Sequence, residues 1–238
     1  MAKVTVGTGS SVLLNLGPQL RYGGDGACST VAWTHGGRAN YSFEGIINYS
    51  AATIAWLKDQ LGLIQSVDEC EAAAAAALDN GGVYLVPAFA GLSAPYWSPD
   101  ARAAIVGLTA HSNRNHVIRA ALESIAYQIR DVLDSMKSRA GVELRTINAD
   151  GGATRNAFLI QFIADVTGLE VTVAQMPDCS SLGAAMAGAM GMGVYASFDQ
   201  LAALPRKVVT YRPRMAAEQV DKLLAGWKRA VAQVLCTG

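Results

Sequence analysis

The sequence predicts an α/β domain built on a mixed β-sheet flanked by helices. Two observations carry this prediction. Short β-type runs follow one another in hairpin-like succession near the N-terminus, and strands then alternate with helical segments through the second half of the chain. In addition, 51% of the 238 residues are hydrophobic and 16% are charged, which is enough apolar material for a sizeable core.

The first part of the chain carries the hairpin-like strands and two helices. Strands are predicted at residues 3–6, 12–16, 30–34 and 40–43. A helix over residues 45–61 follows from an apolar set at helical spacing. A second helix over residues 66–78 is favoured by a run of six alanines.

The second part alternates. Two strands at residues 83–86 and 104–108 flank a loop, and the longest helix should cover residues 115–140, with Gly141 as its C-cap. The remaining predicted elements are, in order, a strand at 144–149, a helix at 156–167, a strand at 170–173 and helices at 181–192 and 216–235.

Charge, cysteine and histidine content exclude several classes of function. Nineteen basic and nineteen acidic side chains give a net charge of zero, which argues against nucleic acid or an anionic membrane as partner. No secretory signal or membrane-spanning segment is visible. The four cysteines are scattered without CxxC spacing, as expected of reduced thiols in a cytoplasmic protein, and with three histidines a protein metal site is not expected.

Three glycine-containing turns share features that suit a phosphate ligand. They read GTG at residues 7–9, DGGA at 150–153 and SSLGAA at 180–185. Glycine lets backbone N–H groups approach a phosphate closely, and a helix start adds unpaired donors. Each turn alone is equally explained as a tight turn, and the GxxxxGK[ST] pattern of a P-loop is absent.

The order of the turns along the chain favours a nucleotide site over simple tight turns. A glycine turn in an early β-hairpin, followed much later by a strand, an Asp-Gly-Gly turn and a helix, is the layout of the actin-like ATPase (ribonuclease H-like) fold. In that fold the hairpin turn reaches the nucleotide phosphates and the Gly-Gly turn lies beside the nucleoside.

Two stretches between these turns resemble a known family. Residues 87–97 read PAFAGLSAPYW, and residues 103–123 run from AAIVGL to AALE. Both closely resemble the signatures of the FGGY carbohydrate kinases, and the run SIAYQIRDVLD at 124–134 is most similar to the glycerol kinases within that family. The resemblance identifies residues 3–235 as a C-terminal actin-like domain of such a kinase.

The resemblance implies ATP-dependent phosphorylation of a polyol or sugar hydroxyl, with ATP and Mg²⁺ as cofactors. By position, Thr8 and its neighbours Gly7 and Gly9 would face the ATP phosphates. These assignments rest on the family and on the glycine turn together.

The second turn would hold the nucleoside. Gly152, between Gly151 and Ala153, would line the adenosine pocket, and Asn156 would contact the base or ribose. Asp150 would either support the turn or hold a hydrated Mg²⁺, because Asp is also a common turn residue.

Three positions depart from the glycerol kinase pattern. Ala51 and Ala55 stand where those kinases have a Gly and a Gln that contact nucleotide, so no amide side chain is available there. Ser11 stands where they have an aromatic residue against the substrate, which leaves room for a larger or more polar polyol.

The family also implies a partner. Its general-base Asp precedes the Gly-Thr-Gly strand, and its N-terminal kinase domain completes the substrate pocket. We therefore expect no catalytic residue in this chain and an inactive isolated chain, since loss of a general base costs about 10²–10⁴-fold. Assembly as a homo-oligomer stays open. A second hypothesis is a non-catalytic interaction or regulatory module built on a half-kinase. Whether the chain is a natural short protein or a piece of a longer one is also open.

Overall fold

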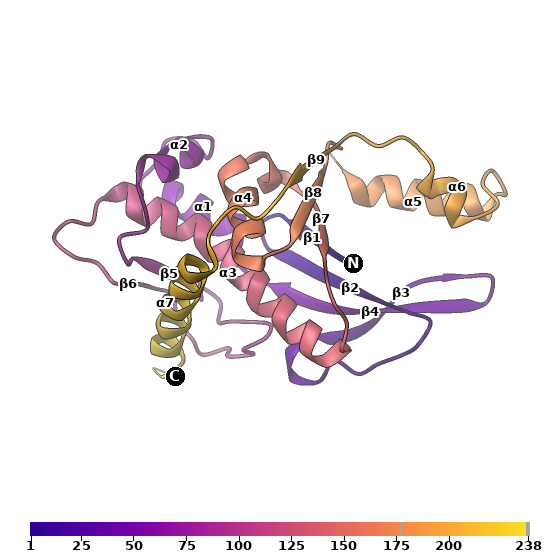
Figure 1. Cartoon of the computed structure of the whole chain (residues 1–238), viewed down its shortest axis with the longest axis horizontal. Coiled ribbons are helices and arrows are strands. Elements are labelled where there is room, and N and C mark those ends of the chain that lie inside the picture. The colour runs from indigo at the N-terminus through magenta and orange to yellow at the C-terminus, as the bar shows by residue number, and fades with distance from the viewer. Residues whose placement is uncertain (177, 237–238) are drawn as a thin grey trace.

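Seven strands form one mixed sheet, which is the framework of the fold (Figure 1). The computed structural model describes residues 1–176 and 178–236. Three central strands, β1, β7 and β8, run parallel, and the outer pairs are antiparallel. In spatial order the strands are β3 (Cys28–His35), β4 (Arg38–Ile47), β2 (Ser10–Gly17), β1 (Ala2–Val6), β7 (Thr146–Asp150), β8 (Glu170–Ala174) and β9 (Val208–Tyr211).

One face of this sheet is covered by helices. Alternate residues of β1 and β2, such as Val4, Val6 and Val12, are buried on that face. This period of two is what a half-buried strand requires. The helices of the chain are α1 (Ala51–Asp59), α2 (Glu69–Ala76), α3 (Arg114–Ala140), α4 (Ala157–Thr167), α5 (Cys179–Gly191), α6 (Phe198–Ala202) and α7 (Ala217–Leu235), with 3-10 turns η1 (Gly24–Gly26) and η2 (Gly152–Arg155).

The long helix α3 passes through the centre of the molecule and contacts α1, α2, α4 and the short strand β5 (Tyr84–Val86). Both of its ends are capped, and the C-cap is the one that the sequence predicts. The Asn113 side chain accepts from the Asn115 amide, and His116 Nδ1 accepts from the Asn113 amide. Gly141 closes the helix with φ +60°, as the prediction of a glycine C-cap requires.

A small unit packs on the outer side of α3. Strand β5 pairs with β6 (Ala104–Val106), and α7 packs beside them. The indole of Trp227 is fully buried, stacks on Tyr127 and donates from Nε1 to Asp131 at 2.6 Å. A buried indole needs a partner for its N–H, and this carboxylate supplies it.

The prediction of an α/β domain with a mixed sheet flanked by helices is confirmed, and one predicted helix is partly wrong. Residues 45–47 belong to β4, where Gly45 pairs with Val12, and helix α1 begins only at Ala51. A Cβ on Gly45 would lie 2.4 Å from Val132 Cγ1, so glycine here lets the strand lie directly against α3. Strand β9 and helix α6 fall between residues 193 and 215, a stretch in which the sequence pattern predicts no element.

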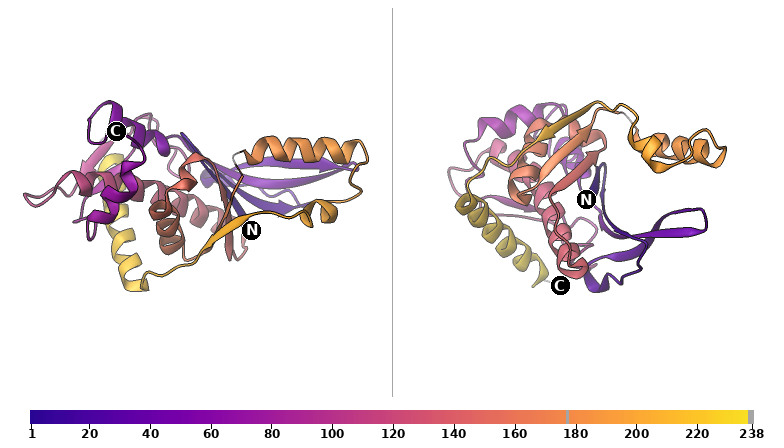
Figure 2. Two further views of the ribbon diagram at one scale, coloured as in Figure 1. Left: turned by 90° about the horizontal axis from the view of Figure 1, so that it is seen from above. Right: turned by 45° about the vertical axis from the view of Figure 1, so that its right-hand side comes forward.

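The β3–β4 hairpin and the α5–α6 segment project from the same side of the molecule (Figure 2). Their outer ends touch, because the rings of Trp33 and His35 lie 6.0 and 5.3 Å from the ring of Phe198. Most of α5 is exposed although its sequence is apolar. Among the described residues, no helix is both long and apolar enough to cross a membrane.

Candidate functional site

The hairpin turn between β1 and β2 is tied to the start of α1. The Ser50 and Ala52 amides both donate to the Thr8 carbonyl at 3.0 Å, and the Ala51 amide donates to the Gly7 carbonyl at 3.0 Å. Helix starts leave their first amides without internal partners, and here the turn supplies the acceptors. The turn therefore holds one fixed position relative to α1.

The turn keeps free donors on its outer side. Thr8 is exposed, and within the described part of the chain neither its amide nor its hydroxyl forms a hydrogen bond. Position 9 needs a glycine because the backbone of Ile47 lies close to it: a Cβ there would be 2.6 Å from the Ile47 carbonyl oxygen. The local geometry thus presents an N–H and an O–H at the tip of a rigid turn.

The second turn contacts the first one directly. Gly151 has φ +100°, and a Cβ there would lie 2.4 Å from the Val6 carbonyl oxygen, one residue before Gly7. The Thr154 hydroxyl donates to the Gly151 carbonyl at 2.7 Å and stabilises the 3-10 turn. Because β1 and β7 are parallel neighbours, their carboxyl ends place both turns at one edge of the sheet.

Helix α4 starts at the end of the second turn. Asn156 is its N-cap, and its Oδ1 accepts from the Leu159 amide at 2.9 Å. Glu71 of α2 adds a second cap, since its Oε2 accepts from the Ala157 amide at 2.9 Å. The Asn156 oxygen is therefore engaged in capping, and only its amide nitrogen is available to a ligand.

A cavity of about 570 Å³ lies between the two turns and the starts of α1 and α2. Six residues named from the sequence line it together: Gly7, Thr8, Ala51, Gly152, Ala153 and Asn156. The others predicted from sequence do not: Gly9, Ser11, Ala55, Asp150 and Gly151. Its floor is apolar, with Ile54, Leu122, Ile125 and Leu159.

Besides the apolar floor, five further lining residues were not predicted from the sequence to belong to the site. They are Val67, Asp68, Cys70 and Glu71 around the start of α2, and Arg155 of η2. Burial raises the pKa of the Cys70 thiol to about 11, with the carboxylates of Glu69 and Asp68 adding to the effect. A thiol that stays protonated is a poor nucleophile, so Cys70 acts as a small packing residue.

Asp150 and Ser11 occupy other surroundings. Asp150 is buried and pairs with Lys3, whose Nζ lies 3.1 Å from Oδ1. It lines a separate hollow of about 680 Å³ beside α5, next to Cys179. Ser11 donates from Oγ to Glu44 Oε1 at 2.9 Å across the β2–β4 pair.

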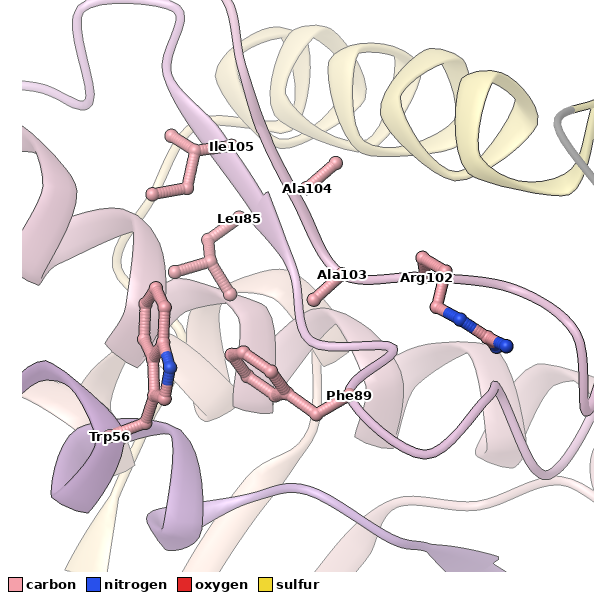
Figure 3. A pocket seen from close by; sticks show the side chains of 7 residues that line it. All are labelled: Trp56, Leu85, Phe89, Arg102, Ala103, Ala104 and Ile105. Carbon is pink, nitrogen blue, oxygen red and sulfur yellow. The ribbon is translucent and has the colours of Figure 1, made fainter. Parts of the chain in front are cut away.

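A smaller pocket of about 310 Å³ lies on the far side of α1 (Figure 3). Its core is the pair of rings of Trp56 and Phe89, whose centroids are 4.7 Å apart. The Arg102 guanidinium extends away from these rings and donates to the backbone carbonyls of Asp100 and Ala101. This pocket is lined mostly by apolar side chains and includes neither glycine turn, so it is not the candidate site.

The fold and the cavity together define a class. Four antiparallel strands, β3, β4, β2 and β1, are continued by the parallel strands β7 and β8, and two glycine turns meet at one sheet edge. This is the arrangement of an actin-like ATPase domain, and solved FGGY kinases share that fold. The chain belongs to the FGGY family of carbohydrate kinases, and residues 2–192 match the C-terminal domain of that family.

Similar proteins agree with this assignment. Glycerol kinase of Shewanella sediminis (strain HAW-EB3) is 46% identical over 235 residues, covering 99% of this chain and 48% of that protein. Glycerol kinase of Desulfitobacterium hafniense is 44% identical with the same coverage. The chain therefore spans about half the length of the curated relatives it matches.

Solved structures lead to the same family. Plasmodium falciparum glycerol kinase, crystallised with ADP, superposes with a TM-score of 0.90 at 33% identity, covering 98% of this chain and 47% of that one. Xylulose kinase from Lactobacillus acidophilus gives a TM-score of 0.83 at 19% identity, with 97% and 47% coverage, and supports the fold alone.

Proposed function

We propose that this chain supplies the nucleotide-binding half of a kinase that transfers a phosphoryl group from ATP to a polyol or sugar hydroxyl. The observation that carries the proposal is the single cavity in which Thr8 and Gly152 meet. Its volume falls within the range of about 300–1,000 Å³ that small-ligand sites occupy.

The residues present fit a nucleotide. The free amide and hydroxyl of Thr8 suit phosphate oxygens, and the apolar floor suits a base. Bound Mg²⁺ would offset phosphate charge during transfer. Among the described residues no cluster of three or more His, Cys, Asp or Glu side chains could hold a metal, and Asp150 is paired with Lys3. The metal would therefore be held chiefly by phosphate oxygens and water.

The contribution of this chain to catalysis would be positioning. The turn at Thr8 is fixed by hydrogen bonds to α1, and the turn at Gly152 is fixed by the contact of Gly151 with Val6. The first turn would orient the phosphates and the second the nucleoside, and such positioning is a major part of catalysis of phosphoryl transfer. The partner would be a second domain of the kind that completes the relatives, carrying the general base and most of the substrate contacts.

The hydrogen-bonded pair of Ser11 and Glu44 concerns the kind of substrate that the kinase would accept. Ser11 stands where the glycerol kinases place an aromatic residue, and it presents a hydroxyl already oriented by a carboxylate. We propose that this position favours a hydroxyl-rich substrate, because an oriented polar pair discriminates by hydrogen bonding.

The test is calorimetric titration of the chain with ADP and ATP. Thr8→Val removes the hydroxyl and should weaken binding about tenfold, the value of one hydrogen bond to a charged group. Thr34→Val, on the exposed β3 strand, is the matched control and should change nothing. A wild-type chain that binds neither nucleotide, or a Thr8→Val chain with unchanged affinity, would contradict the proposal. A coupled assay with and without an added N-terminal half then separates the kinase from a non-catalytic module.

A further inference from the structure

Charge is unevenly distributed around the nucleotide cavity. Among the described residues that line it, Asp68 and Glu71 are acidic and Arg155 alone is basic. A nucleotide diphosphate or triphosphate would therefore enter a cavity whose own side chains carry a net charge of −1. Any cation in this wall then adds to the affinity for an anion, and because Arg155 is exposed this contribution should be screened by salt.

Arg155 is free to meet a ligand. It is the last residue of η2, and within the described part of the chain its guanidinium forms no hydrogen bond and no ion pair. The neighbouring carboxylate of Glu71 is already engaged by the Ala157 amide. Other basic side chains close to acids in this structure are paired, as Arg119 is with Glu123 at 2.7 Å.

The guanidinium lies beside the second turn. Its Nη2 is 4.0 Å from the position that a Cβ on Gly152 would take. Arg155 and Gly152 line the same cavity as Gly7 and Thr8 of the hairpin turn. The exposed side chain is therefore within this cavity wall, next to Gly152.

We propose that Arg155 is a nucleotide-binding residue that contacts the phosphate chain, and that it supplies the positive charge of this wall. This inference rests on the proposed function. Arginine suits the role, since its planar fork donates two parallel hydrogen bonds to phosphate oxygens. The glycine turns offer backbone donors but no positive charge, so they do not provide this contact with the phosphate chain.

The experiment compares ligands with and without phosphates. Arg155→Gln should raise the Kd for ADP about tenfold, the value of a charge-assisted hydrogen bond at a partly exposed site. The Kd for adenosine should change less than about twofold, since adenosine carries no charge. Arg155→Lys keeps the charge but not the planar fork, so its ADP affinity should lie between those of wild type and Arg155→Gln. The control is Arg38→Gln, at the exposed start of β4, which should leave both values unchanged.

Salt dependence supplies a second readout. Raising the salt concentration should weaken ADP binding to the wild-type chain more steeply than to the Arg155→Gln chain. Equal losses for ADP and adenosine would mean that the side chain packs on the nucleoside, and they would overturn the inference. An unchanged ADP affinity or an unchanged salt slope would overturn it as well. If Thr8→Val weakens ADP binding while Arg155→Gln does not, the proposed function stands and only this inference fails. If the wild-type chain binds no ADP, both fail.

Discussion

The two neighbouring glycines of the second turn should separate folding from binding. Gly151 has φ +100° and lies against the Val6 carbonyl, whereas Gly152 has only the Arg155 side chain near its missing Cβ, at 4.0 Å. Alanine at each position therefore tests a different property. Gly151→Ala tests the contact between the turns, and Gly152→Ala tests the cavity wall.

The cost of Gly151→Ala follows from two terms. A non-glycine residue at positive φ costs about 1–2 kcal/mol. A Cβ placed 2.4 Å from the Val6 oxygen also forces a backbone shift, and overpacking of this kind costs about 1–3 kcal/mol. The sum is about 3 kcal/mol, which corresponds to a fall in Tm of roughly 6–12 °C for a chain of this size.

Gly152→Ala should behave in the opposite way. Its backbone is outside the positive-φ region and the space is open, so the free energy of unfolding should change by less than about 1 kcal/mol. The added methyl group projects into the space proposed for the nucleoside, and ADP affinity should fall about tenfold.

Urea unfolding and ADP titration of both variants provide the measurement. A Gly151→Ala chain as stable as wild type would refute the argument that the two turns are in forced contact. A stable Gly152→Ala chain with wild-type ADP affinity would refute the placement of the nucleoside against this turn.

Two further expectations concern the buried groups. Burial raises the pKa of Asp131, so its contribution to stability is full below the unfolded pKa and is lost as pH rises through the raised folded value. Asp131→Asn keeps an oxygen that can accept from Tyr96 and Trp227. In urea unfolding, its free energy of unfolding should increase relative to that of wild type as pH rises from 4 to 8. Asp131→Ala leaves both donors unsatisfied and should cost about 2–4 kcal/mol at pH 4, and this cost should shrink as pH rises because only the wild type loses the stability linked to the raised pKa; a parallel pH dependence of the Asn variant and wild type would contradict this reasoning. In maleimide labelling followed by mass spectrometry, exposed Cys28 should react in the native chain and buried Cys70 only in denaturant. Labelling of Cys70 in the native chain would show that the start of α2 opens readily.

The meeting of the two turns follows from their order along the chain, because that order is the layout of the actin-like fold. Local patterns predict that each turn follows a short β-type run. The long-range parallel pairing of β1 with β7 then places the carboxyl ends of both strands, and so Thr8 and Gly152, at one edge of the sheet.

Other parts of the site depend on packing that no local pattern reports. Asp68 and Glu71 read as ordinary acidic residues at a helix start, and only the packing of α2 against α4 turns Glu71 into a cap for Ala157. Residues 45–47 were assigned to a helix because Ile46 and Ile47 continue the apolar period of α1. They form part of strand β4 instead, because they pair with β2, and this is a long-range contact.

The departures at Ala51 and Ala55 differ in their consequences for the cavity. Ala55 does not line the cavity, so a missing amide side chain there leaves the described wall intact. Ala51 does line it, and its backbone amide is used by the Gly7 carbonyl, so this position offers a ligand only a methyl group. The donors on this wall include the backbone and hydroxyl of Thr8, the backbone amides of Gly152 and Ala153, the amide nitrogen of Asn156 and the guanidinium of Arg155. An ATP site built this way would depend on its phosphate end more than on its base end, so replacing ADP by GDP should cost less affinity than removing the Arg155 charge.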